Sequence, residues 1–137
     1  MAEVVDLYGF LHPEETPEKE VVVSKRFKDK NGNVMAFRIK PLSQDICNQI
    51  QKTCIKTDKK NRQVFDRVKY VSETTAASVT FPDLKNAALQ KTYGVIGEAA
   101  LLEKMLYTNE YDHLVDEVQT LSGLDDFETV KEEAKNE

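Results

Sequence analysis

Apolar and polar residues alternate in a helical rhythm over residues 80–123, where single residues separate three short amphipathic segments. Asn86 and Gly94 flank the first segment, which we predict to be a helix over 87–93. Asparagine favours the N-cap position, and glycine favours the left-handed conformation that ends many helices. The second segment follows Gly97. Helices of this length are marginal in water, so we expect them to pack on one another or on a partner.

The second and third segments carry the densest apolar patterning in the chain. In the third, apolar residues recur at i, i+3, i+4, i+7 and i+10, the spacing of one helix face. The members of this stripe are Tyr111, Leu114, Val115, Val118 and Leu121. We expect Thr108 or Asn109 to cap this helix and Gly123 to end it in a left-handed conformation.

Residues 21–40 alternate apolar and polar positions with the period of a β-strand. The apolar positions are Val21, Val23, Phe27, Met35, Phe37 and Ile39. The Asn31-Gly32 pair between them is expected to supply the positive φ angles of a tight turn. This pattern predicts a hairpin with its apolar face against helices. One edge stays open for self-association or for a partner's strand unless the N-terminal arm covers it.

Two further helices are predicted between the hairpin and the three short segments. Ser43 is expected to cap the first, whose apolar stripe includes Cys47 and Cys54. The second is predicted over about 61–79 and is expected to form the wall on which the short helices pack. Cysteines seven residues apart on a helix are separated by about 10 Å, too far for a disulfide. We therefore interpret them as buried, reduced thiols rather than redox or nucleophilic groups.

The patterns together predict an α+β fold, mainly α, in which an N-terminal β-hairpin is followed by a bundle of about four to five helices. A chain of 137 residues fits one domain that buries a core without metals or disulfides. The predicted parts are an N-terminal arm and linker over 1–20, a globular domain over 21–123 with the hairpin at 21–40 and the helices at 43–123, and an acidic tail over 124–137.

The N-terminal arm has a short apolar stretch followed by a charged one. A short helix is predicted near residues 3–11, with Val4, Val5, Tyr8 and Leu11 on one side. Residues 14–20 combine charge and proline, which is typical of a solvated linker. The first residues include acidic side chains where a secretory signal has basic ones, and no apolar run approaches the ~20 residues of a membrane span. We therefore expect a cytoplasmic protein.

The chain lacks the sequence signatures of common catalytic sites. It has no glycine-rich phosphate loop, no cluster at metal-ligand spacing and no nucleophile within a recognisable base motif. We expect no enzyme activity, no cofactor and no metal. Tyr93, Tyr107 and Tyr111 with Met105 could line a pocket, but helical spacing favours the core for them.

Several stretches resemble a known family. They are the turn RFKDKNGN, the step IKPLSQD from strand to helix, and the series FPDLKNAALQKTYGV, LLEKML and EYDHLVDEVQTLSG. Their order and spacing are similar to those of the XkdN-like tail assembly chaperones of phages and prophages of Gram-positive bacteria. The resemblance covers about residues 21–123. Phe37 stands where the family pattern suggests tryptophan, and Tyr107-Thr108-Asn109 replaces leucine-proline-glycine before the last helix.

The resemblance implies a non-catalytic role in phage tail assembly, in the cytoplasm of a bacterial host. Such chaperones are thought to bind the long, helical tape-measure protein, keep it soluble and help recruit tail tube protein around it. Self-association along this client is a further expectation, whereas a membrane partner is not expected. Exposed apolar ridges suit this task. The expected partner-binding residues, partly exposed in the free protein, are Leu101, Leu102, Met105, Leu106, Tyr107 and Tyr111.

Two other functions stay open at this point. The first is a structural tail component that is retained in the particle. The second is a nucleic-acid-binding regulator, suggested by residues 52–69, where seven lysines and arginines face only two aspartates. The regulator is less favoured because the whole chain has a net charge of -5 and Phe65 is the one aromatic well inside the basic run.

Overall fold

The computed structural model describes residues 6–123, and the predicted acidic tail lies outside them, as do Val4 and Val5. In chain order the elements are α1 (Tyr8–Leu11), β1 (Lys19–Val21), β2 (Phe37–Ile39), α2 (Gln44–Thr53), β3 (Ile55–Thr57), β4 (Gln63–Phe65), α3 (Arg67–Ser78), β5 (Val79–Phe81), α4 (Ala87–Tyr93), α5 (Glu98–Met105) and α6 (Thr108–Leu121). The predicted α+β class, with a hairpin before a set of helices, is confirmed.

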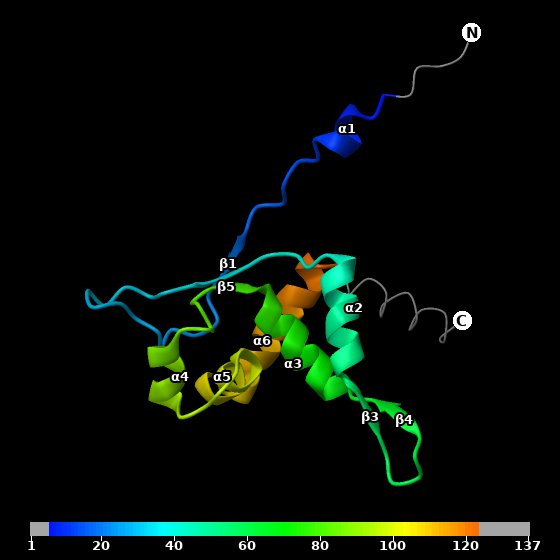
Figure 1. Ribbon diagram of the computed structural model, residues 1–137. Helices are drawn as coiled ribbons and strands as arrows, with labels where there is room; N and C mark the ends of the chain where they lie inside the picture. The colour runs from blue at the N-terminus through cyan, green and yellow to red at the C-terminus, as the bar shows by residue number, and fades with distance from the viewer. Residues whose placement is uncertain (1–5, 124–137) are drawn as a thin grey trace, which may run out of the picture.

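Helix α3 lies at the centre of the molecule, with α2 on one side and α5 and α6 on the other (Figure 1). Helix α4 packs mainly against α5. The predicted wall therefore exists for two of the three short helices. The arm that carries α1 and the hairpin formed by β3 and β4 both extend away from this body (Figure 1).

The main sheet joins two distant parts of the chain. Strand β1 pairs antiparallel with β2, placing Val21 opposite Phe37, and β2 pairs on its other side with β5, where Ile39 faces Val79. Strand β5 therefore covers the edge of the hairpin at β2, whereas β1 is the outer strand of this sheet among the described residues, so one edge of the hairpin stays open as expected. The arm continues into β1 instead of covering a neighbouring strand.

The connection between β1 and β2, residues 22–36, is longer than a tight hairpin turn and is called the hairpin loop below. At its tip the carboxylate of Asp29 accepts hydrogen bonds from the backbone N–H groups of Asn31 and Asn33, at 2.8 and 2.9 Å. Of the predicted Asn31-Gly32 pair, only Gly32 has a positive φ, at +85°. Glycine adopts this conformation without a steric penalty.

A second hairpin, β3–β4, replaces the first part of the long helix predicted over 61–79. Asn61 at its tip has a φ of +62°, and the carboxylate of Asp58 accepts the N–H groups of Lys60 and Arg62 at 2.9 Å each. This arrangement matches the tip at Asp29. The helix prediction is wrong here because the turn gives the backbone N–H groups an alternative partner to helical carbonyls.

Helix α3 starts after Asp66, whose carboxylate accepts the N–H of Lys69 at 3.1 Å as an N-cap. It ends at Ser78 because the next three residues pair with β2. Its core-facing side is polar and small, whereas Val68 near its start is 76% exposed. The buried residues of α3 are Ser72, Thr74, Thr75, Ala76 and Ser78.

The polar side chains on α3 have partners inside the protein. The hydroxyl of Ser72 donates to the carboxylate of Glu103 at 2.6 Å and lies 2.9 Å from the hydroxyl of Tyr111. The hydroxyl of Thr74 donates to the carbonyl of Tyr70 at 2.8 Å. Burial of polar groups is tolerated when they are hydrogen-bonded, so this face packs against α5 and α6 without a desolvation penalty.

Most of the predicted helix ends are confirmed. The side chain of Asn86 accepts the N–H of Leu89 at 2.9 Å, Gly94 ends α4 with a φ of +67°, and Gly97 precedes α5. The N-cap of α6 is Tyr107 rather than Thr108 or Asn109. Glu110 is the third residue of α6, and its carboxylate accepts the N–H of Tyr107 at 2.8 Å. This hydrogen bond gives the backbone N–H of the N-cap residue a partner.

The core lies between the sheet and helices α3, α5 and α6. Its buried apolar members are Val21, Val23, Phe37, Ile39, Ala76, Leu84, Leu101, Leu102, Met105, Leu106, Leu114 and Val118. Cys47 and Cys54 are buried and reduced, as predicted. Among the helices within residues 6–123, none is long and apolar enough to cross a membrane.

Candidate docking surface

The six predicted partner-binding residues fall into two environments. Four of them, Leu101, Leu102, Met105 and Leu106, are buried, and the first two have no exposed surface at all. The expectation of partial exposure is wrong for these four, because α5 turns its apolar face toward the core and toward α3. The helical spacing of these apolar residues is present in the structure, but it belongs to a core-facing side of α5.

The two tyrosines of the set keep some exposed surface. Tyr111 is partly buried, and its hydroxyl hydrogen-bonds with Ser72; burial is the main cause of its raised pKa. Tyr107 is 65% exposed at the junction between α5 and α6. Whether either tyrosine contacts a partner stays a prediction, and Tyr107 is the more accessible of the two.

An apolar groove opens on the surface between the hairpin loop, β5 and α4. It encloses a cavity of about 230 Å³. Its lining residues are Phe27, Met35, Ala36, Phe37, Phe81, Pro82, Leu89, Tyr93 and Met105. Every one of them is apolar or aromatic, and they come from four separate parts of the chain, so no single sequence window reveals the groove.

The walls of the apolar groove include side chains that a soluble monomer usually covers. Met35 and Phe81 are each 39% exposed, whereas Phe37 and Met105 are buried beneath them. The guanidinium of Arg38 lies 5.6 Å from the centre of the Phe81 ring, a cation–π contact that orients the ring. Contiguous exposed apolar surface of this kind marks docking sites.

Arg26 connects the apolar groove to Tyr107. Its guanidinium lies 5.1 Å from the ring centre of Phe27, which lines the groove, and 4.3 Å from that of Tyr107. It also donates to the carboxylate of Glu110 through Nε at 3.1 Å and to the carbonyl of Met105 at 3.0 Å. The hairpin loop is thereby attached to the start of α6.

The Arg26–Glu110 pair is the strongest electrostatic feature of the described residues. Glu110 is buried, and its hydrogen bond with Arg26 is the main reason that its pKa falls to about 2. The same bond raises the pKa of Arg26. A bidentate arginine–carboxylate pair fixes geometry as well as charge, so this pair holds one end of the apolar groove in place.

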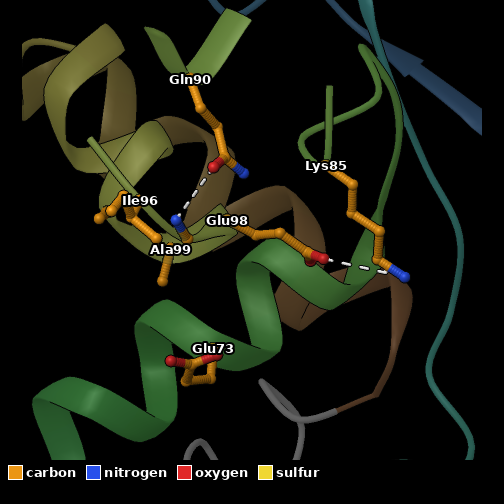
Figure 2. Close-up of a pocket in the computed structure, with 8 residues that line it drawn as sticks. Glu73, Lys85, Gln90, Ile96, Glu98 and Ala99 are labelled. Atoms are coloured by element: carbon orange, nitrogen blue, oxygen red, sulfur yellow. Dashed lines mark hydrogen bonds and ion pairs between the residues drawn. The ribbon is translucent and has the colours of Figure 1, made fainter. Parts of the chain in front are cut away.

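A second hollow of about 480 Å³ lies between α3, α4 and the start of α5, and it is polar (Figure 2). Gln90 reaches across it, accepting the N–H of Gly97 at 3.2 Å and donating to the carbonyl of Leu84 at 2.8 Å. Lys85 faces Glu98 at 3.9 Å (Figure 2). These contacts tie α4 to α5, so we interpret this hollow as a joint rather than a docking site.

The basic run over 52–69 mostly forms the β3–β4 hairpin. Part of its charge is neutralised, because Lys56 pairs with Asp66 at 3.5 Å and Arg62 with Asp58 at 2.9 Å. Lys69 donates to the carbonyl of Thr53 at 2.9 Å. The run as a whole keeps its excess of five positive charges, because these two aspartates are its only acidic residues.

The arm carries a second apolar feature, on α1. Its apolar side chains are all exposed, and Phe10 is the most accessible at 85%. The others are Leu7, Tyr8 and Leu11. Of the short helix predicted near residues 3–11, with Tyr8 and Leu11 on one side, the described residues form only Tyr8–Leu11 as α1. No role was predicted for Phe10 from the sequence.

Tyr93 and Met105, named from the sequence as possible pocket residues, both line the groove. The other groove residues and Phe10 were missed by sequence reasoning for different reasons. The groove is assembled from segments more than 70 residues apart, such as Phe27 and Met105, and needs the fold to appear. Phe10 had a usable signal: a five-residue apolar cluster, LYGFL, between Asp6 and Glu14 in an otherwise polar arm. A cluster that cannot join the core of its own domain is a docking candidate.

These features define an α+β domain with an apolar groove on its surface. Within residues 6–123, no group of His, Cys, Asp and Glu side chains is arranged to hold a metal. The chain belongs to the family described as "Phage XkdN-like tail assembly chaperone protein, TAC", whose model matches residues 7–135.

Relatives support this assignment. The chain is 31% identical over 142 residues to the phage-like element PBSX protein XkdN of Bacillus subtilis (strain 168), covering 97% of this chain and 95% of that protein. It is 28% identical over 141 residues to the uncharacterised protein YqbN of the same strain, with the same coverage. A crystal structure of the protein YqbN superimposes with a TM-score of 0.76 at 23% identity, over 88% of this chain and 98% of that one, which shows a shared fold.

Proposed function

We propose that this protein is a non-catalytic chaperone that binds the tape-measure protein of a phage or prophage tail in the cytoplasm of the bacterial host. Its family is one of phage tail assembly chaperones, which supports the general role. The observation that supports the binding mode is the apolar groove with its exposed Met35 and Phe81 walls. The client keeps its own apolar residues out of water by placing them there, and tail tube protein is recruited afterwards.

The shape of the groove suits a helical client. Helix-in-groove recognition places apolar residues at i, i+3, i+4 and i+7 of an amphipathic helix into a hydrophobic surface. The groove accepts one or two such residues, and Tyr107 next to Arg26 extends the contact by a further turn. Tyr and Arg are enriched among the residues that carry binding energy in protein interfaces.

We revise the expectation of direct partner contact for four residues, namely Leu101, Leu102, Met105 and Leu106. Met105 contributes to the floor of the apolar groove. The other three support the helix that forms this floor and contact the client only if α5 leaves the core. We therefore assign direct client contact to Met35, Phe81, Tyr93 and Tyr107, with Tyr111 at the margin.

Co-expression with the tape-measure protein of the same genetic element tests this function. We expect the tape measure to stay soluble and to co-purify with the wild-type chain. Met35→Glu places a charge in the groove wall and is expected to abolish co-purification, while Val68→Glu, an exposed position on α3, leaves it intact. A tape measure that precipitates alone in the presence of the wild-type chain contradicts the proposal.

A retained structural component of the tail remains the competing function. It shares the family and the fold, but it persists in mature particles. Mass spectrometry of purified tails separates the two: a chaperone is absent from them, whereas a structural component is present in amounts comparable to the tail tube protein.

A further inference from the structure

We propose that the N-terminal arm of one copy of this chain docks into the apolar groove of a second copy. The anchor is Phe10, which is 85% exposed on α1, and the acceptor is the cavity lined by Phe27, Met35, Phe81 and Tyr93. Both apolar features are exposed within residues 6–123.

The sizes of anchor and acceptor match. An apolar cavity of about 150 Å³ holds one benzene molecule, so the cavity of about 230 Å³ has room for the Phe10 ring and part of a neighbouring leucine. Leu7, three residues before Phe10, and Leu11, directly after it, are also exposed. They are placed to contact the groove walls at Met35 and Phe81.

The charges around the two features are complementary. The arm carries acidic residues on both sides of its apolar cluster, namely Asp6, Glu14, Glu15 and Glu18. The hairpin loop beside the groove carries Lys25, Lys28 and Lys30, and α4 adds Lys91. The one acidic side chain at the loop tip, Asp29, already accepts backbone N–H groups. Opposite charges at the rim of an interface favour the correct register and speed association.

The direction of the arm favours a second copy over the chain's own groove. Strand β1 and the ion pair between Lys19 and Glu117 fix the point where the arm leaves the body. From there the arm runs away from α4 and the hairpin loop (Figure 1). The linker over 12–18 contains Pro13 and Pro17, and prolines restrict such segments to extended conformations. An extended linker of this length spans about 23 Å and carries α1 outward.

Exchange of arms in both directions gives a closed two-fold dimer. Each copy then contributes one arm and one groove, as in an isologous assembly. The arm occupies the groove until a client with a longer apolar helix displaces it. That displacement rests on the proposed function, whereas the contact between copies is independent of any client and is tested without one.

Sedimentation equilibrium of the purified full-length chain tests the contact. We expect the wild type to form a dimer. Phe10→Ser and Met35→Glu are each expected to weaken dimerisation at least tenfold, which corresponds to about 1.4 kcal/mol. Val68→Ser, at an exposed position on α3, leaves it unchanged and serves as the matched control.

A mixing experiment tests the pairing of arm with groove. The Phe10→Ser chain retains an intact groove, and the Met35→Glu chain retains an intact arm. An equal mixture is expected to form a mixed dimer through one remaining contact, although each variant alone is monomeric. Because Phe10 lies on the exposed arm, its variant remains informative even if Met35→Glu destabilises the fold.

Three results overturn the inference. A monomeric wild type at high concentration excludes the dimer, including the case in which the arm covers its own groove. A dimer that survives Phe10→Ser places the interface elsewhere. A mixture of the two variants that remains monomeric shows that the arm and the groove do not bind each other.

Discussion

Helices α5 and α1 have similar apolar side chains but opposite environments. In α5 the leucines at 101 and 102 have no exposed surface, whereas in α1 Phe10 is 85% exposed and Leu11 69%. The difference lies in their neighbours. The hydrogen bond from Ser72 to Glu103 holds α5 against α3, and the contact between the hydroxyls of Ser72 and Tyr111 does the same for α6. A proline-containing linker, in contrast, keeps α1 away from the body.

This contrast teaches that apolar spacing alone does not separate a core helix from a docking helix. Both patterns satisfy the same periodicity. The two helices differ in whether the fold packs a second apolar surface against their apolar side chains. In α5 the core and α3 provide that face, and in α1 we expect a second copy of the chain to provide it. The predictions below test this contrast, from the largest expected effect to the smallest.

Truncation of a core leucine on α5 has the largest expected effect. Leu102→Ala is expected to lower the free energy of unfolding by about 3 kcal/mol, because it removes buried methyl groups and leaves a cavity. The matched change on the arm, Leu11→Ala, is expected to alter it by less than about 0.5 kcal/mol. Urea denaturation of both variants measures the difference. Equal destabilisation by the two changes contradicts the contrast.

Loss of the Glu110 carboxylate is expected to cost less. Glu110→Gln removes the charge that Arg26 binds and is expected to lower the free energy of unfolding by about 1–2 kcal/mol, since Arg26 is partly exposed and water screens the pair. Glu98→Gln is the control, because its ion pair with Lys85 is long and exposed. If Glu110→Gln leaves the free energy of unfolding unchanged, the hairpin loop is held by other contacts.

The same residue predicts a pH dependence. Hydrogen bonding to Arg26 lowers the pKa of Glu110 from 4.5 to about 2, so its contribution to stability is complete above pH 4.5 and is lost as the pH falls toward 2. Urea denaturation across this range is expected to show a smaller decrease in stability for Glu110→Gln than for the wild type. Parallel decreases in the two proteins exclude Glu110 as the source.

The wall of the apolar groove depends on a helix cap. Asn86→Ala removes the side-chain oxygen that accepts the N–H of Leu89, and it is expected to cost about 1 kcal/mol. Lys91→Ala, exposed on the same helix, is the control. Amide hydrogen exchange in α4 is expected to accelerate in the Asn86 variant alone. Unchanged exchange shows that packing against α5, not the cap, holds this wall.

The smallest expected effect on stability is that of Phe10→Ser. The variant is expected to unfold within about 0.5 kcal/mol of the wild type at concentrations where both are monomeric, since the Phe10 side chain is 85% exposed. Thermal unfolding of the dilute proteins measures this. A large loss of stability contradicts the assignment of α1 as an unpartnered segment.

Much of the fold was predictable because local signals agreed with the tertiary structure. Asn86, Gly94 and Gly97 mark helix ends in the sequence and in the structure alike. The β3–β4 hairpin was missed although its tip, DKKNR, repeats the arrangement of DKNGN in the first hairpin. In both, an aspartate accepts two backbone N–H groups and the fourth residue has a positive φ. Asparagine in place of glycine concealed the second turn.

The docking surface was less predictable than the fold. The apolar groove combines side chains from the hairpin loop, β5, α4 and α5, so it exists only after β5 joins the sheet beside β2. The sequence pattern predicted Val79 as the end of a helix, so the pairing of β5 with β2 was not expected. Leu101 and Leu102 were expected at a partner surface. Apolar periodicity identifies the apolar face of a helix, but it does not show which part of the protein or which partner packs against that face.

Hydrogen exchange of the co-purified complex with the tape-measure protein tests the central claim most directly. Local protection reports which backbone segments become covered on binding. We predict that protection increases at the hairpin loop, at β5 and in α4, the segments that form the apolar groove, while β3–β4 is unchanged. Increased protection confined to the β3–β4 hairpin or α2 would contradict the claim that the groove is the surface that binds the client.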